Sequence, residues 1–298
     1  MGLRLDPNSL PNMLAAIEQA QQNQQTAIQQ MATGRSVNNI SDNPVAAGAL
    51  VVNDAQTSQT DQYITNIGDV QGKLQAADSA LNNANTIMTT AITVGAEGAN
   101  GTMSTGDRQA LAEQVQGLQQ QMLGIANTSY QGVYIFGGTN VTTTPFAQSA
   151  GSPSGVQYNG NTGTTSVQVG DGQSVQTNVA GSQIFLNGSG NVFQALNDLA
   201  NALNSGTGIE AANTEVQQAF SQMSTQRIVY GNQLSQLQSQ QSFLSQEQVN
   251  LSSQQTQLVG ANLTQVVANE SQSQVDLEAA LSATGQVLSL PSLLSYLK

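Results

Sequence analysis

Residues that commonly carry enzyme chemistry are scarce in this chain of 298 residues. It contains no His and no Cys, which excludes the usual zinc ligand sets, thiol nucleophiles and histidine acid–base catalysis. Carboxylates are the remaining candidates, and four of them recur at intervals of seven to nine residues: Asp54, Asp61, Asp69 and Asp78. This spacing distributes them along helix surfaces, where we expect solvated charges rather than a paired catalytic site.

The chain also lacks the patterns that bind nucleotides and nucleic acids. Its glycine-rich segment, residues 160–172, has neither P-loop spacing nor a dinucleotide fingerprint. The 18 acidic and 6 basic residues give a net charge of −12, and the basic residues form no cluster. We therefore expect no enzymatic activity, no cofactor, no metal ion and no nucleic-acid partner.

Most polar side chains are uncharged, because only 8% of the residues are charged. A neutral polar surface suits close packing against many neighbours, since every buried charge would need a partner. The longest mostly apolar run, residues 45–52, is too short to span a bilayer. Residues 1–10 lack the apolar run of a signal peptide. We expect no membrane partner, and any export to use a route without a cleaved leader.

The last third of the chain, residues 209–290, is expected to form one long helix. No proline interrupts residues 209–290, and a seven-residue apolar repeat runs through Val216, Met223, Tyr230, Leu237, Leu244, Leu251 and Leu258. Such a repeat is typical of a coiled coil, because it keeps one seam facing a partner helix. Glutamines at companion positions dilute the seam, so the helix would be marginal alone.

A second diluted seam lies near the N-terminus: Leu10, Leu14, Ile17, Gln21, Gln24, Ile28 and Met31. The two ends are therefore expected to pair with each other, or with copies of themselves in an assembly. Gly34 is placed to stop the N-terminal helix. Ser41 or Asp42 can cap the next helix, with Pro44 in its first turn.

The next seam is the most regular in the chain, with nine positions at alternating spacings of four and three: Tyr63, Ile67, Val70, Leu74, Ala77, Leu81, Ala84, Met88 and Ala91. It predicts a helix that ends near residues 95–98. Ser104 and Asp107 then form a capping box for another helix, with apolar positions from Leu111 to Ile125.

From Tyr130 the pattern changes to short alternating segments separated by Gly, Ser, Thr and Asn. Val167 and Val169, a turn at residues 170–172, and Val175 predict a β-hairpin. A short helix with apolar residues from Phe193 to Leu203 follows, and residues 206–208 form a linker.

These elements predict a mainly α fold with an inserted small β-domain, in which both chain termini build a long antiparallel coiled-coil or helical-bundle rod. Residues 1–40 and 255–298 would form a terminal helical assembly domain. Residues 41–129 and 206–254 would form a helical rod domain, and residues 130–205 a β-rich outer domain.

Two segments carry a resemblance to a known family. Residues 33–47 read TGRSVNNISDNPVAA, which resembles a turn of the form TG-R/K…SDDPA/VAA, with Asn43 in place of the second Asp. Residues 100–111 read NGTMSTGDRQAL and resemble an NGT-S-DR-I/L segment. On these residues the chain resembles the flagellin-like family of axial proteins.

Within that family, two further segments resemble the hook-associated branch more than flagellin. Residues 126–146 match an ANT…G-YLFAG…T-PF pattern, and the tail resembles LSLLDYL, with Pro291 and Ser292 inserted. The resemblance implies a structural component of the bacterial flagellum, an adaptor layer joining a hook-associated protein to the filament. It also implies extracellular localisation after type III export.

The resemblance further implies which proteins the chain contacts. These are another hook-associated protein on one side, flagellin on the other, copies of itself in a ring-like layer, and an export chaperone. In the family, the terminal segments fold into helical tubes on assembly, which fits the diluted seams. The expected assembly interface comprises Leu14, Ile17, Ile28, Met31, Arg35, Asp42, Asn43, Pro44, Leu277, Leu281, Leu288, Leu290, Leu293, Leu294, Tyr296 and Leu297.

Two other functions remain open. The chain could be a flagellin that forms the filament itself. It could also be a needle-tip or translocator protein of a secretion system, since these are also coiled-coil proteins without a leader. The second alternative does not account for the turn at residues 34–44 or the match at residues 134–146.

Overall fold

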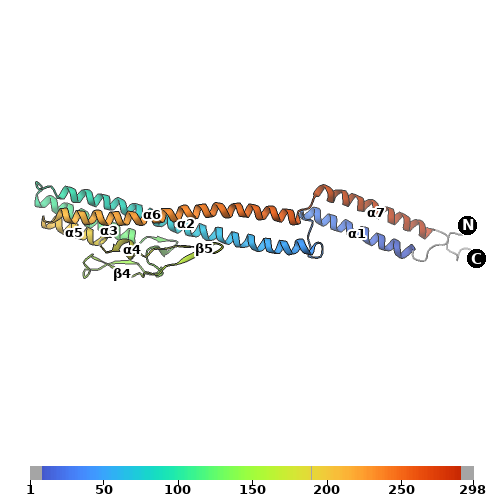
Figure 1. The fold of residues 1–298 in the computed structure, drawn as a ribbon, viewed down its shortest axis with the longest axis horizontal. Helices are drawn as coiled ribbons and strands as arrows, with labels where there is room; N and C mark the ends of the chain where they lie inside the picture. Colours follow the sequence, from blue (N-terminus) through green and yellow to red (C-terminus); the bar gives the residue numbers. More distant parts are fainter. Residues whose placement is uncertain (1–8, 189, 290–298) are drawn as a thin grey trace, which may run out of the picture. The chain divides into compact units, whose positions relative to one another are not determined.

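The computed structural model describes residues 9–188 and 190–289, with side chains described for residues 11–188 and 190–286. The described chain divides into two compact units. We call residues 60–247 the central unit, and residues 1–59 together with 248–298 the terminal unit. The two long helices, α2 (Pro44–Gly98) and α6 (Ile209–Val259), contribute residues to both units (Figure 1).

The central unit is built on the regular seam of α2. All nine predicted seam positions are buried, as are the predicted α6 positions from Val216 to Leu244. Both sets belong to one hydrophobic core. Arg227 of α6 donates to Asp78 of α2 at 2.9 Å, in the only ion pair between described residues. The two seams predicted from the seven-residue spacing are therefore confirmed here.

Two shorter helices complete this core. Helix α3 (Thr105–Ala126) begins at the predicted cap, because the Ser104 hydroxyl accepts from the Asp107 backbone N–H at 3.2 Å. Helix α5 (Val192–Ser205) packs against α3 and ends at Gly206, whose φ of 72° is a left-handed conformation that favours glycine.

The inserted region consists of small antiparallel pairs rather than one sheet. In the described chain these are β1 (Ser129–Tyr130) with β2 (Val133–Tyr134), β3 (Phe146–Gln148) with β4 (Val156–Tyr158), β5 (Ser166–Gly170) with β6 (Gln173–Gln176), and β7 (Leu186–Asn187) with β8 (Gly190–Asn191). The predicted hairpin is β5–β6, in which Val167 faces Val175. Helix α4 (Gly181–Phe185) precedes β7.

Four buried phenylalanines hold the inserted region together. The Phe146 ring lies 5.5 Å from Phe185 and 5.6 Å from Phe193 of α5, and Phe136 meets Phe185 edge-on at 5.3 Å. Such aromatic contacts add to the free energy gained by burying the rings. The fold is thus mainly α with a small inserted β region, as predicted.

The terminal unit contains α1 (Ser9–Thr33) and α7 (Leu263–Ser289), which lie side by side (Figure 1). The backbone N–H of Ala261 donates to Gly34, so the end of α1 meets the start of α7. The two helices are therefore antiparallel. Gly34, with a φ of 67°, ends α1 as predicted.

The prediction of one helix over residues 209–290 is wrong, because α6 ends at Val259 and α7 begins at Leu263. At Gly260 an added Cβ would lie 2.4 Å from the Thr256 carbonyl oxygen, so any other residue here would force the backbone to shift. The Asn262 side chain then accepts from the Gln265 N–H at 3.3 Å and caps α7.

Three positions of the seam predicted for α1 are not buried within the chain, so their pairing with other copies stays a prediction. Leu14, Gln21 and Ile28 are exposed. Ala20 and Ala27 are buried instead. Small side chains allow the two helices to approach closely, and the larger residues beside them are left facing solvent.

Candidate assembly surface

The contact between α1 and α7 is made through small side chains. The residues buried in the described parts of these helices are Ala20, Ala27, Val266 and Ser273. Three of the predicted interface residues, Ile17, Met31 and Leu277, are half-buried. Since a buried methylene contributes about 0.8 kcal/mol, a contact built mainly on alanine stabilises the pair weakly.

Large hydrophobic side chains lie beside this contact and face solvent. Leu14 and Ile28 of α1 and Val267 and Leu281 of α7 are 50–56% exposed. We call these four residues the terminal stripe. Leu14, Ile28 and Leu281 were predicted as interface residues from the sequence, and Val267 was not.

The four residues fall into two level pairs. Gly34 contacts Ala261; Ile28 lies six residues before Gly34, and Val267 lies six residues after Ala261. Leu14 and Leu281 are each twenty residues from the same contact. Since both helices rise by about 1.5 Å per residue, Ile28 is level with Val267 and Leu14 with Leu281.

All four residues also lie on one side of the α1–α7 pair. Each directly follows a residue that is buried or half-buried in the pair: Met13, Ala27, Val266 and Ala280. Each is therefore turned about 100° from the contact in the same rotational sense. In an antiparallel pair, the same sense of rotation on both helices points to the same side. The terminal stripe is thus one apolar surface.

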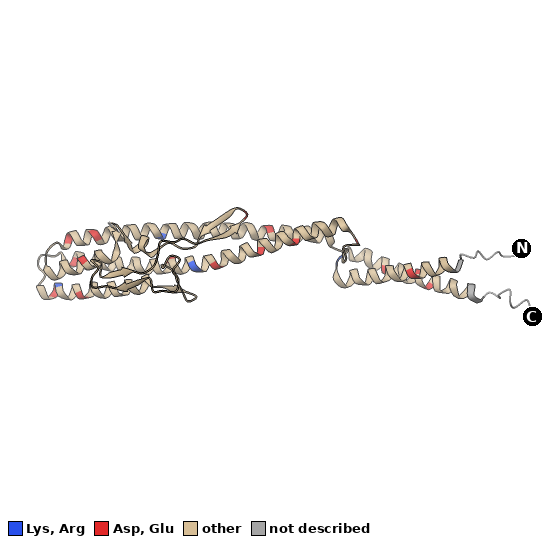
Figure 2. Ribbon diagram, turned by 90° about the horizontal axis from the view of Figure 1, so that it is seen from below, with Lys and Arg blue, Asp and Glu red and all other residues tan. Residues whose placement is uncertain are grey.

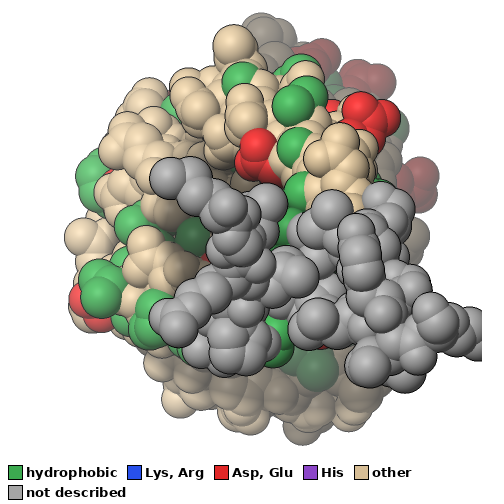
Figure 3. Space-filling model, turned by 90° about the vertical axis from the view of Figure 1, so that its right-hand side faces the viewer, with side chains coloured by type: hydrophobic (Ala, Val, Ile, Leu, Met, Phe, Trp, Pro, Cys, Tyr) green, Lys and Arg blue, Asp and Glu red, His purple; other side chains and the backbone are tan. Residues whose placement is uncertain are grey.

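Neutral polar side chains surround the terminal stripe. The charged residues described in α1 and α7 are Glu18, Glu270, Asp276 and Glu278, all acidic. Several side-chain amides donate hydrogen bonds to side chains one helical turn away: Gln19 donates to Asn23 at 2.9 Å, and Gln265 donates to Asn269 at 2.9 Å. Figure 2 shows the resulting sparse charge, and Figure 3 shows a face on which most visible side chains are neutral, with scattered hydrophobic and acidic ones. This surface can therefore be buried without removing many charges from water.

A backbone bridge joins the two helix breaks of the terminal unit. Arg35 and Gly260 form an antiparallel β-bridge. The Ser36 N–H donates to Val259 at 2.7 Å, and the Ala261 N–H donates to Gly34 at 2.9 Å. Val37 and Val259 are buried beside this bridge with the start of α2. The segment between α1 and α2 is thus joined by backbone hydrogen bonds to the segment between α6 and α7.

Asp42 orders the turn before α2, but it does not cap the helix. Its carboxylate accepts the backbone N–H groups of Asn38 and Asn39 at 2.9 and 2.8 Å. The hydrogen bond from Asn39, and to a lesser extent that from Asn38, holds the pKa of Asp42 below its ordinary value. The cap is Asn43, whose side chain accepts from the Ala46 N–H at 3.1 Å. The prediction of Ser41 or Asp42 as the cap is therefore wrong, because the Asp42 carboxylate turns back to residues 38 and 39.

The remaining predicted interface residues lie at the joint or at the C-terminus. Arg35 is half-buried, whereas Asp42, Asn43 and Pro44 are exposed. Leu288 belongs to α7, but its side chain lies outside the described part. The other predicted residues are outside the described chain altogether: Leu290, Leu293, Leu294, Tyr296 and Leu297.

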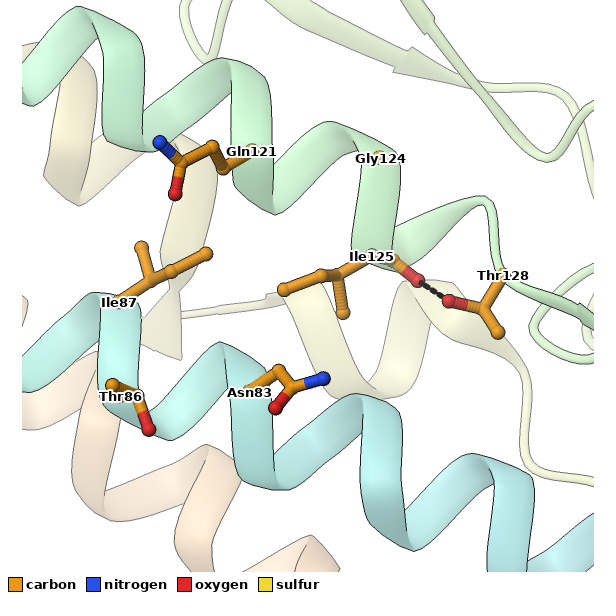
Figure 4. Close-up of a pocket in the computed structure, with 7 residues that line it drawn as sticks. All are labelled: Asn83, Thr86, Ile87, Gln121, Gly124, Ile125 and Thr128. Carbon is orange, nitrogen blue, oxygen red and sulfur yellow. Dashed lines mark hydrogen bonds between the residues drawn. The ribbon is translucent and has the colours of Figure 1, made fainter.

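The central unit has an open groove of about 490 Å³ between α2 and α3. Ile87 of α2 and Ile125 of α3 approach each other across it, with Asn83, Thr86 and Gln121 around them (Figure 4). Its lining contains no ionisable side chain. The groove can accept a neutral or apolar surface, but it holds no acid, base or nucleophilic thiol.

The aspartates considered as catalytic candidates are separated along α2. Asp54 accepts from Gln255 at 3.1 Å, and Asp78 pairs with Arg227. Within residues 9–188 and 190–289, no group of three or more acidic residues could hold a metal ion. No helix in these ranges is both long and apolar enough to cross a membrane.

The chain is similar to proteins of the bacterial flagellum. Residues 8–141 match the family described as the bacterial flagellin N-terminal helical region. Flagellar hook-associated protein 3 of Salmonella typhimurium is 28% identical over 280 residues, which cover 85% of this chain and 86% of that protein. Flagellin A of Vibrio cholerae is 30% identical over 135 residues, which cover 44% of this chain and 34% of that protein.

Solved structures share the fold. The structure of Xanthomonas campestris FlgL aligns with a TM-score of 0.60 at 20% identity, covering 67% of this chain and 98% of that one. The similarity to hook-associated protein 3 thus extends over most of both chains, whereas the similarity to flagellin covers less than half of each.

Proposed function

Because residues 8–141 match the bacterial flagellin N-terminal helical region and most of the chain is similar to flagellar hook-associated protein 3, we propose that it is a structural component of the bacterial flagellum, an adaptor layer at the hook–filament junction. The coverage of the two kinds of relative supports an adaptor over a filament subunit. The match to hook-associated protein 3 covers 85% of this chain, while the flagellin match covers 44% of it.

The observation that carries this proposal is the exposed terminal stripe on a weakly packed helix pair. An isolated copy leaves Leu14, Ile28, Val267 and Leu281 in water. Neighbouring subunits that cover these side chains would stabilise the α1–α7 pair by mass action. Assembly then contributes the burial that the pair lacks alone.

The proposed partners are a hook-associated protein on one side, flagellin on the other, and copies of this chain in a ring-like layer. An export chaperone would hold the chain before assembly, and export would proceed without a cleaved leader to the outside of the cell. Residues 1–40 and 255–298 would form the assembly domain, 41–129 and 206–254 the rod domain, and 130–205 the outer domain.

The joint residues Arg35, Asp42, Asn43 and Pro44 would keep the assembly domain correctly placed. Backbone hydrogen bonds already fasten this joint, and the half-buried Arg35 side chain would contact a neighbouring subunit. The C-terminal residues from Leu288 to Leu297 would extend the apolar interface. Catalysis has no part in this proposal.

Electron microscopy of purified protein mixed with short hook fragments tests the proposal. We expect a thin layer on fragment ends that stops growing. Ile28→Asp should abolish the layer, because it places a charge in the terminal stripe. Phe243→Asp is the matched control, since Phe243 is an exposed hydrophobic residue of the central unit.

Two outcomes would contradict the proposal. Long filaments of this protein alone would identify a flagellin. Monomers that bind no flagellar fragment would favour the secretion-system alternative.

A further inference from the structure

A second exposed apolar surface lies on the first turns of α2, within the terminal unit. Val45, Val51 and Val52 are 58–82% exposed. Gly48 and Ala55 are exposed among them, and nothing lies within 4 Å of the position that a Cβ would take at Gly48. We call these five residues the valine face.

The valine face points away from the helix that α2 packs against. Ala46, Ala47 and Asn53 are buried, and the Asn53 side chain donates to the Leu251 carbonyl of α6 at 3.1 Å. At about 100° per residue, the centre of the valine face lies on the opposite side of α2. Helix α6 therefore does not cover it.

The valine face and the terminal stripe differ in shape. Gly48 and Ala55 leave a shallow area between the valines of the valine face, whereas the terminal stripe presents two leucines, one isoleucine and one valine. Large side chains of one helix pack well against small residues of another. The two surfaces are thus complementary in size.

Neither surface requires a charge to be buried. Asp54 is the only ionisable residue between positions 45 and 55, and it lies beside the valine face, where it accepts from Gln255. No charged residue belongs to the terminal stripe. An anionic membrane or nucleic acid is a poor occupant, because Arg35 is the only basic residue described in this unit.

We propose that the valine face of one copy receives the terminal stripe of the next copy in the layer. This inference rests on the proposed function, because it assumes that copies lie side by side. The contact is heterologous, since the two surfaces are different parts of the same chain. Each copy then uses one surface toward each neighbour, which allows a layer to continue or close as a ring.

A contact between identical surfaces would have a different consequence. Two terminal stripes facing each other would form a two-fold dimer and leave both valine faces exposed. The heterologous contact covers both kinds of surface in every copy. It accounts for the presence of two apolar surfaces in a unit with few buried hydrophobic residues.

Disulfide cross-linking tests the contact directly, because the natural chain has no Cys. Val52→Cys and Ile28→Cys are made as separate single variants, mixed, assembled on hook fragments and oxidised. We expect a cross-linked dimer that contains one copy of each variant. Thr65→Cys, which is exposed further along α2, replaces Val52→Cys in the control and should give no dimer with Ile28→Cys.

The outcomes separate this inference from the proposed function. Protein bound to fragment ends without a mixed dimer overturns the inference and leaves the adaptor function standing. Dimers formed within either variant alone, without mixed dimers, also overturn it, since they show identical surfaces in contact. Failure of the unmodified protein to bind fragments overturns the proposed function itself.

A charge variant provides a second measurement. Val52→Asp should lower the amount of assembled layer by roughly tenfold or more at a given concentration, a change equivalent to about 1.4 kcal/mol or more. Its circular dichroism should match that of the natural protein, because Val52 is exposed. Thr65→Asp should assemble normally. Normal assembly of Val52→Asp would overturn the contact.

Discussion

The central and terminal units use the same seven-residue spacing but fill it with different side chains. The central unit buries 41 of the hydrophobic residues with described exposure, and the terminal unit buries eight, of which four are alanine. Conversely, 11 of the 14 exposed large hydrophobic residues belong to the terminal unit. The central unit is thus well packed within one chain, whereas the terminal unit leaves most of its large hydrophobic side chains in water.

This difference shows that a heptad pattern alone does not identify the partner of a seam. In α2 the large residues of the seam are buried within the same chain. In α1 alanines make the internal contact, and the larger residues Leu14 and Ile28 remain exposed. The variants below test this division, beginning with the largest expected effect.

Phe193→Ala should destabilise the isolated protein by about 3–5 kcal/mol, because it removes a fully buried ring from the central core. Ile28→Ala in the terminal unit should change monomer stability by only about 0.5 kcal/mol or less, because Ile28 is half-exposed. Urea unfolding followed by circular dichroism measures both. Equal losses would show that the terminal unit is as well packed as the central one.

Gly95→Ala should cost about 1–3 kcal/mol, because the new Cβ would lie 2.5 Å from the Asn213 side chain, which is buried. Gly117→Ala is the matched change on α3, where nothing lies within 4 Å. It should gain about 0.5–1 kcal/mol from helix propensity. The same urea experiment applies, and a gain in both variants would contradict close packing of α2 against α6.

Asp78→Asn should destabilise the central unit by less than about 1 kcal/mol, because its pair with Arg227 is partly exposed to solvent. The loss should shrink in high salt, where the pair is screened in the natural protein. A loss that is large and independent of salt would show that the pair is effectively buried.

Asp42→Asn should have the smallest effect and act only on the joint. The depressed pKa of Asp42 means that its bonds to Asn38 and Asn39 stabilise the fold at neutral pH and are lost as pH falls through that pKa. Amide chemical shifts of Asn38 and Asn39 should therefore differ between variant and natural protein at neutral pH and converge in acid. A difference that persists after Asp42 is protonated would contradict this origin.

Several elements could be predicted from the sequence because a single local pattern, such as an apolar repeat or a capping residue, determines each of them. The nine-position seam of α2, the capping box at Ser104 and the hairpin at residues 166–176 agree with the structure. Each is a local pattern whose partner is nearby or in the same core. The fold class follows from them.

Elsewhere in the chain, two signals compete. Two interleaved seams in α1 share Ile17 and Met31, and the sequence alone does not show that the alanines of one seam make the contact with α7 while Leu14 and Ile28 of the other are exposed. Gly260 followed by the capping residue Asn262 indicates a helix break. The seven-residue repeat before this point nevertheless favoured a single continuous helix. Residues 45–52 form a mostly apolar run, so the sequence does not distinguish the exposed side of this part of α2 from its buried side.

Hydrogen exchange of the free protein and the assembled layer tests the central claim most directly. In the free protein, we expect amides of α1 and α7 to exchange at least about 100-fold faster than those of α3 and α5. On assembly, α1 and α7 should become protected to a similar level. Equal protection of both units in the free protein would contradict the dependence of the terminal unit on its neighbours.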